Sequence, residues 1–337
     1  MFFWRAIRDN CGYVLTNVRS LSIVGVALGT ATFCNLTRSE PSPPSFHQDK
    51  SVAANRNAGD SKGDGNTLPQ VTIEGQRKKI EHQAYEFVRK VTHNPRFQDD
   101  SVPRWNAPLC FAVAGLPTNQ GLFALGRLSE IARAAGASVA RPGCKYNFFV
   151  VFAATPDELL KKAFHLHPKA FDRCDGLQEI KEFLAPSKPQ AVRVWHNVRP
   201  FRRDGMPIAL PIRCGDGTSD NRDIPISLQY FPSRIERYDV IAFSLALVVV
   251  DTAYPKSVKL GQLVDYAAMV GLADIASGAD LGDVPSILRI FDQSPDQQPS
   301  GLTQWDEAFL SALYRSDQAS QTQRSQIAVK MSHGILP

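Results

Sequence analysis

Apolar side chains recur at helical spacing early in the expected folded region. The stripe consists of Ile80, Ala84, Phe87, Val88 and Val91. Residues spaced in this way lie on one face of an amphipathic helix, which must pack against other elements. The pattern therefore predicts a helix here and a folded region that begins near Val71.

Apolar runs of strand length follow this helix. Residues 108–116 and 147–154 are two such runs, and a helical pattern over residues 119–135 separates them. Residues 191–195 and 224–230 alternate like strands with one solvated face, and we expect them to pair as a hairpin. The run Ala246-Leu247-Val248-Val249-Val250 does not alternate, which is typical of a central strand buried on both faces.

Further helices are predicted from apolar content and capping patterns. Residues 260–275 are almost wholly apolar, as expected of a helix that is buried all round. Thr155-Pro156-Asp157-Glu158 has the form of a capping box. Thr303 and Asp306 precede a helix over residues 304–314, and a shorter helix is expected at residues 286–291.

The order of these elements predicts an α+β fold, with a mixed β-sheet packed by helices in a single globular domain over residues 71–317. Residues 35–70 are rich in Ser, Pro, Asn, Asp and Gly, so we expect a disordered linker. Ser, Gln and Thr are frequent after Asp317, and residues 318–337 are expected to form a C-terminal tail.

The N-terminus resembles an export signal. Basic residues precede an uncharged, largely apolar run at residues 20–37, and Gly29 and Ala31 are small residues suited to cleavage after Ala31. Residues 1–34 are therefore expected to be a signal peptide or a single membrane anchor. A lipoprotein anchored at Cys34 and a buried N-terminal helix are less favoured. The predicted location is periplasmic or secreted, and the N-terminal segment is the sole expected membrane contact.

Composition and charge narrow the classes of partner. The 337 residues are 43% hydrophobic and 21% charged, as in globular proteins. The net charge of +5 is small for this length, so nucleic acid is not an expected partner. Another envelope protein is a partner that fits the predicted location.

The cysteines predict disulfides rather than a metal or redox site. None of the six forms a C-x-x-C pair. Cys110 lies at the end of one predicted strand segment and Cys144 just before the next, so a bridge that joins these neighbouring strands forms easily. Cys174 and Cys214 then remain as a second pair, giving two disulfides in an exported chain.

Motifs for common catalytic chemistry are absent. The sequence has no H-E-x-x-H, no G-x-S-x-G, no P-loop and no dinucleotide-binding glycine pattern. We therefore expect no metal and no cofactor, and the sequence favours a protein that is not an enzyme. Asp251, Asp265 and His196 are weak catalytic candidates, because buried carboxylates need partners and a carboxylate pair can serve acid–base chemistry.

A basic segment is the candidate binding site. His196 ends a predicted strand and is followed by Arg199, Arg202 and Arg203. Side chains of this kind bind acidic groups, although a solvated surface is the more frequent role of such a run. His93, at the end of the first helix, is expected on the surface.

Several short segments of the sequence resemble those of a group of uncharacterised secreted bacterial proteins that are distantly similar to zincin metallopeptidases. They are Arg104-Trp105-Asn106, residues 247–251, residues 264–272 and Trp305-Asp306. The resemblance matches Gly271-Leu272 to the residues after the second zincin histidine. It then places Val264 and Ala268 at the metal-binding positions and Asp265 at the catalytic glutamate.

The resemblance therefore implies a metallopeptidase-like scaffold that has lost its metal, because valine and alanine do not bind zinc. We expect an exported, non-catalytic, envelope-associated or binding protein. One alternative is a hydrolase with a non-standard site. The other is a partner-binding module whose basic loop takes an acidic ligand.

Overall fold

The computed structural model describes residues 68–93, 101–171, 179–202, 239–254, 257–276 and 278–336. The helices are α2 (Leu68–Val91), α3 (Thr118–Ala135), α4 (Pro156–Leu166), α5 (Glu179–Leu184), α6 (Leu260–Leu272), α7 (Gln304–Arg315) and α8 (Gln323–Ile335). The strands are β1 (Arg104–Trp105), β2 (Phe111–Ala114), β3 (Phe148–Ala153), β4 (Val192–Arg202) and β5 (Asp239–Asp251). The predictions for residues 1–34, for most of the linker and for the strand at 224–230 lie outside the described residues.

The sheet is mostly parallel. Strand β5 lies beside β3, and β3 lies beside β2, all in parallel, while β4 pairs with β5 in the antiparallel sense. The short strand β1 pairs in parallel with the first half of β5. The expected combination of helices with one mixed sheet is therefore confirmed, and this arrangement fits the α/β class as well as the α+β class.

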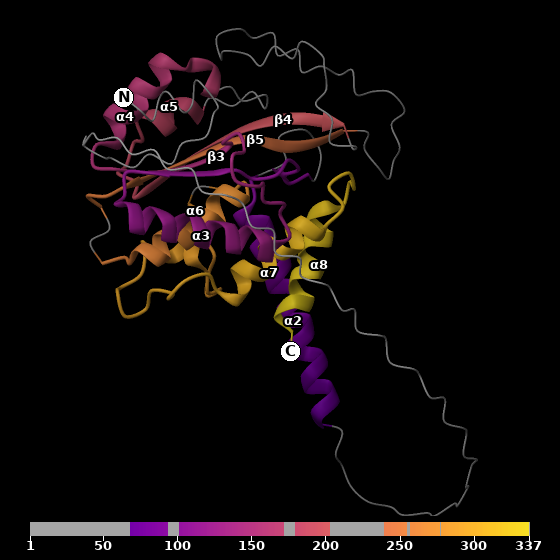
Figure 1. The fold of residues 1–337 in the computed structure, drawn as a ribbon. Coiled ribbons are helices and arrows are strands. Elements are labelled where there is room, and N and C mark those ends of the chain that lie inside the picture. The colour runs from indigo at the N-terminus through magenta and orange to yellow at the C-terminus, as the bar shows by residue number, and fades with distance from the viewer. Residues whose placement is uncertain are drawn as a thin grey trace, which may run out of the picture. The chain divides into compact units, whose positions relative to one another are not determined.

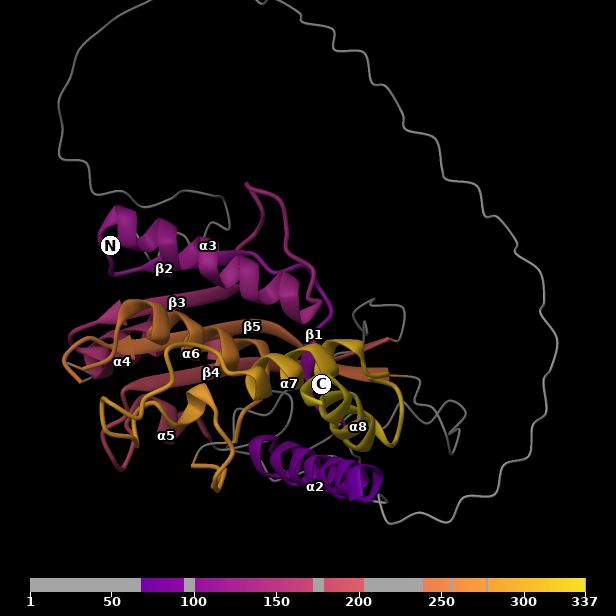
Figure 2. The same cartoon turned by 90° about the horizontal axis from the view of Figure 1, so that it is seen from below.

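Helices cover both faces of the sheet. Figure 1 shows α4 and α5 on one face and α3 and α6 on the other, and Figure 2 shows α3 and α6 running along the sheet. Val248 and Val250 of β5 belong to the larger core, on the α6 side, whereas Leu247 and Val249 belong to the smaller core with α4 and α5. Burial on both faces explains why this run does not alternate.

Helix α6 is buried almost all round, as its apolar sequence predicts. Ten of its residues are buried. At Gly271 a Cβ atom would lie only 2.1 Å from the ring of Phe148 on β3. The helix therefore approaches the sheet at a distance that only glycine permits at this position.

Strand β4 is longer and more buried than its sequence suggests. It continues past Trp195 to Arg202, and it has no solvated face at Arg193, which is 6% exposed. The Arg193 guanidinium donates to Asp157 of α4 and points toward the last carbonyl groups of α5. A charged residue can lie under these helices because its charge is paired there.

The two predicted caps differ in outcome. Thr155 precedes α4 but makes no capping bond, because its backbone has ψ of 71° rather than the extended value that an N-cap needs. Thr303 has ψ of 166° and forms the full capping box with Asp306. The expected helix at 286–291 is only a 3₁₀ turn, Ile287–Arg289.

The expected C-terminal tail is wrong in the part that the structure describes. Residues 323–335 form α8, which packs against α7, and Ile327 and Met331 are fully buried. Polar residues here are used internally, since the Gln323 side chain accepts from the Val102 N–H at 2.8 Å. The Ser- and Gln-rich composition therefore predicts a tail where the structure has a packed helix.

Helix α2 joins the same core through the predicted apolar stripe. Phe87 contacts Trp305 and Phe309 of α7, with ring centroids 6.0 and 5.7 Å away. The described residues from Ile73 onward belong to one compact unit. Within the described ranges, no helix has both the length and the apolar character needed to cross a membrane.

Candidate functional site

Asp265, the residue that the zincin resemblance places at the catalytic position, is held by Arg127. Arg127 Nε donates to Asp265 Oδ1 at 2.7 Å and Nη2 donates to Oδ2 at 2.9 Å, and the Leu302 N–H adds a third bond at 3.0 Å. The carboxylate is 2% exposed. Its hydrogen bonds raise the pKa of Arg127. Asp265 is therefore the partner of Arg127 in a structural ion pair.

The residues around Asp265 do not fit a zinc ion. Val264 and Ala268 of α6 are 1% and 0% exposed and belong to the larger core. Hydrocarbon side chains offer no lone pair to a metal. Among the residues that the structure describes, no group of three or more His, Cys, Asp or Glu side chains is arranged so that it could hold a metal ion.

Asp251 has a local structural role at the end of β5. Its Oδ1 accepts a hydrogen bond at 2.8 Å from the backbone N–H of Ala253. This is the bond of an Asx turn, which carries the chain out of the strand. The described contacts of Asp251 and Asp265 are to different groups, so no interaction joins the two carboxylates into an acid–base pair.

His196 lies inside β4 rather than at a strand end, and it is 2% exposed. Its ring stacks on Phe243 with centroids 4.2 Å apart, and its Nε2 lies 3.4 Å from the Gly271 carbonyl oxygen. The predicted position of His196 on a solvated anion-binding surface is therefore wrong. Arg199 is half-buried in the same strand, and Arg202 ends it. Arg203 lies outside the described residues.

Asp274, after α6, lies between two histidines. His93 Nδ1 is 3.2 Å from Asp274 Oδ1, and His196 Nδ1 is 3.9 Å from the same oxygen. The His93 side chain is 24% exposed, so it is less exposed than the sequence predicts. An antiparallel bridge from Thr92 to Ile275 fixes the end of α2 here. This buried polar cluster connects α2 to the sheet.

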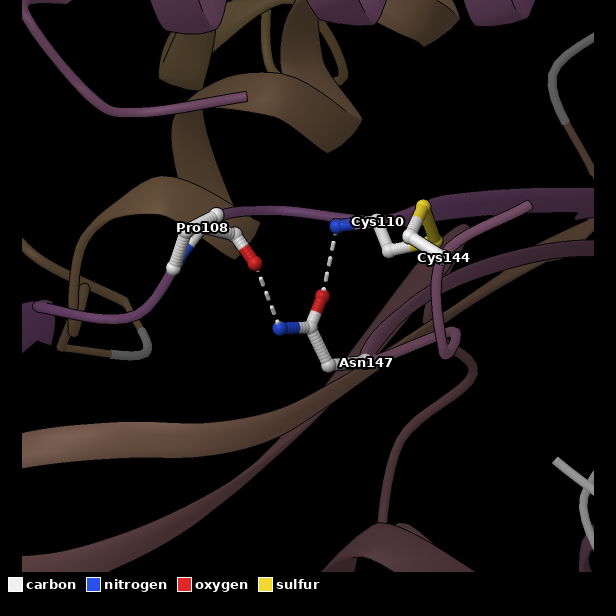
Figure 3. The surroundings of a disulfide bond; sticks show 4 residues. All are labelled: Pro108, Cys110, Cys144 and Asn147. Atoms are coloured by element: carbon white, nitrogen blue, oxygen red, sulfur yellow. Dashed lines mark hydrogen bonds between the residues drawn. A yellow bond between two sulfur atoms is a disulfide. The ribbon is translucent and has the colours of Figure 1, made fainter. Parts of the chain in front are cut away.

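The first predicted disulfide is present. Cys110 and Cys144 are bridged across a sequence separation of 34 residues. Asn147 holds the adjoining segment, since its side chain accepts from the Cys110 N–H at 2.8 Å and donates to the Pro108 carbonyl at 3.0 Å (Figure 3). A cross-link over a loop of this length stabilises a fold by about 4 kcal/mol in the chain-entropy model. Cys174 and Cys214 lie outside the described residues.

A pocket of about 490 Å³ lies at the edge of the sheet where β1 and β5 begin. Its walls come from β1, from the turn after α3 and from the end of α7. Its lining residues include Arg104, Ala137, Ser138, Val240, Tyr314 and Asp317. Pockets of this size accommodate small organic molecules.

Arg104 is the charged group in the wall of this pocket. Its Nη1 donates to the carbonyl oxygens of Leu313, at 2.5 Å, and Ser316, at 3.1 Å. The guanidinium lies 5.8 Å from the centre of the Tyr314 ring. Burial lowers the pKa of Arg104 from its usual value. The charge of Asp317, in the same wall, acts on the Arg104 pKa in the opposite direction.

Arg104 is not among the binding residues predicted from the sequence. The segment Arg104-Trp105-Asn106 contributes there only to the family resemblance. The sequence does contain a signal for Arg104. An arginine beside a tryptophan in a short strand is expected to be half-buried, and a half-buried cation needs hydrogen-bond acceptors. Those acceptors lie more than 200 positions further along the chain.

Comparison of the chain with protein-family models, curated proteins and solved structures gives no match. The function is therefore argued from the geometry above.

Proposed function

We propose that this chain is an exported, disulfide-bonded protein of the cell envelope that binds a ligand or partner without transforming it. The scaffold would be that of a metallopeptidase-like domain whose catalytic position has become structural. The Arg104 pocket would be the binding site.

The main support for the proposal is that both carboxylate oxygens of Asp265 are hydrogen-bonded inside the protein. A catalytic carboxylate must be free to accept or donate a proton, and it must face a substrate or an activated water molecule. The two oxygens of Asp265 instead accept three hydrogen bonds inside the protein. Val264 and Ala268 belong to the core. Asp265, which the zincin resemblance matches to the catalytic glutamate, therefore has the contacts of a structural ion pair.

The disulfide supports the export component of the proposal. Stable disulfides form in the periplasm and outside the cell, and they are rare in the cytosol of most organisms. Cys110 is 2% exposed and immediately precedes strand β2. This bridge therefore suits a domain that folds in an oxidising compartment.

Zinc content and the stability of Asp265 variants test the proposal. The full chain, incubated with zinc and dialysed, is expected to retain none. Asp265→Ala is expected to lower the free energy of unfolding by about 2–4 kcal/mol, because it leaves the partly exposed Arg127 and the Leu302 N–H without a partner.

The control is the double variant Arg127→Met with Asp265→Leu, which removes both charges. It should be more stable than Asp265→Ala, because no unpaired charge remains. Tight, stoichiometric zinc that disappears in Asp265→Ala would overturn the proposal.

A further inference from the structure

The Arg104 guanidinium has unused hydrogen-bonding capacity on the pocket side. Its two side-chain hydrogen bonds in the described part of the chain come from Nη1 and go to neutral carbonyl groups. Nε and Nη2 have no acceptor in the described part of the chain, yet neither is a fully buried, unpaired atom. Arg104 lines the pocket, so these two donors are the ones that a ligand there can use.

These two donors match one kind of ligand group. Nε and Nη2 of an arginine form a parallel pair of N–H bonds that fits the two oxygens of a carboxylate or a phosphate. A half-buried cation with neutral partners gains more from such an anion than a solvated arginine does, because part of its desolvation cost is already met by the fold.

The charge around the pocket favours a single negative charge. The C-terminal ends of α3 and α7 both border it, and helix C-termini carry partial negative charge. Asp317 adds a carboxylate to the wall. These groups offset much of the Arg104 charge, so a phosphate dianion would be repelled more strongly than a carboxylate.

The remaining wall is suited to an apolar body. Ala137, Val240 and the Tyr314 ring line the pocket beside Arg104. The Tyr314 hydroxyl is directed away into the protein, where it donates to the Leu272 carbonyl at 2.9 Å. The aromatic ring is thereby fixed as a flat surface next to the cation.

We propose that the Arg104 pocket binds a small organic monocarboxylate, whose carboxylate pairs with Nε and Nη2 of Arg104 and whose apolar part lies against Tyr314 and Ala137. This inference rests on the proposed function, because it names the ligand class of a binding protein.

Calorimetry on the full chain at constant ionic strength tests this assignment. The probes are acetate, hexanoate, benzoate and phenylacetate, with benzamide as the neutral counterpart of benzoate and inorganic phosphate as the dianion. At least one carboxylate with an apolar body is expected to bind in a saturable, one-to-one manner. Benzamide and phosphate should bind at least 10-fold more weakly than that carboxylate.

Three variants locate the site. Arg104→Met should weaken carboxylate binding at least 10-fold, whereas Arg315→Met, which removes an exposed charge from the same end of α7, should leave it unchanged. Because Arg104 also holds the end of α7, Arg104→Met is at risk of unfolding. If Arg104→Met does not fold, Ser138→Asp provides the test. The substitution adds a negative charge at an exposed position of the wall and should also weaken carboxylate binding at least 10-fold.

The inference is overturned if none of the four carboxylates binds, if benzamide or phosphate binds as tightly as the best carboxylate, or if Ser138→Asp leaves binding unchanged. These outcomes are read by calorimetry and do not depend on zinc content, so failure of the ligand class is distinguishable from failure of the proposed function.

Discussion

Asp306 shows how a buried carboxyl group can organise two segments at once. Its oxygens accept hydrogen bonds from the Ser286 hydroxyl at 2.5 Å, from the Ile287 N–H at 2.8 Å and from the Thr303 N–H at 2.9 Å. The residue is fully buried. It therefore fixes the start of α7 and the turn at Ile287–Arg289 together.

Removing this carboxyl group should be costly. Asp306→Ala leaves the Ile287 and Thr303 N–H groups buried without acceptors, so we expect the free energy of unfolding to fall by about 3 kcal/mol. Asp306→Asn should cost less, because its amide oxygen can accept from the two N–H groups while its NH₂ donates to Ser286. Urea denaturation at pH 7 measures both changes.

The same residue predicts a dependence on pH. Burial raises the pKa of Asp306 above its unfolded value of about 4, although its hydrogen bonds act in the opposite direction. The folded state then holds the proton more tightly than the unfolded state. Its contribution is complete below pH 4 and is lost as the pH rises through the folded pKa.

The stability of the native protein relative to Asp306→Asn should therefore decrease between pH 4 and pH 7. Urea titrations of both proteins across this range measure the difference. A difference that increases with pH would show that the hydrogen bonds, and not burial, control this group.

Individual partners were largely beyond sequence reasoning. The sequence indicated that a buried Asp265 needs a partner, but Arg127 is 138 positions away. Nothing local to either residue identifies the other. His196 was misplaced for a similar reason, since the length of β4 depends on pairing with β5 rather than on its own residues.

At the scale of elements, the contact between α6 and β3 depends on Gly271. Phe148 occupies the space where a side chain would begin, since a Cβ atom would lie 2.1 Å from its ring. Gly271→Ala should therefore lower the free energy of unfolding by about 2 kcal/mol, despite the better helix propensity of alanine.

Gly126→Ala in α3 is the matched control for this prediction. No atom lies within 4 Å of its added Cβ, so alanine should raise stability by about 0.5–1 kcal/mol. Thermal denaturation of both variants measures the contrast. Equal effects at the two positions would show that α6 is not in close contact with Phe148.

Elements with strong apolar patterns were predictable, whereas those that depend on tertiary contacts were not. Strand β5 and helix α6 are predictable from apolar runs such as residues 246–250, because an apolar composition indicates burial. Helix α8 is amphipathic only weakly, and its polar residues are satisfied by distant groups such as Val102. Composition alone therefore assigned that segment to a tail.

At the scale of the whole molecule, the chain has a disulfide, a helix-covered sheet with a pocket at one edge, and a predicted export signal. The disulfide and the fold are seen in the structure, while the export signal was inferred from residues 1–34. Their agreement supports the proposal of an envelope location, because stable disulfides form mainly in oxidising compartments.

Cell fractionation followed by mass spectrometry tests this central claim most directly. The full chain, produced in a bacterial host with an oxidising periplasm, is compared with a variant that lacks residues 2–31. We predict that the full chain reaches the periplasmic or envelope fraction with Cys110 and Cys144 recovered as one disulfide-linked pair of peptides. The truncated variant should remain in the cytosol with both thiols free. Recovery of the full chain in the cytosol with both thiols free would contradict the account.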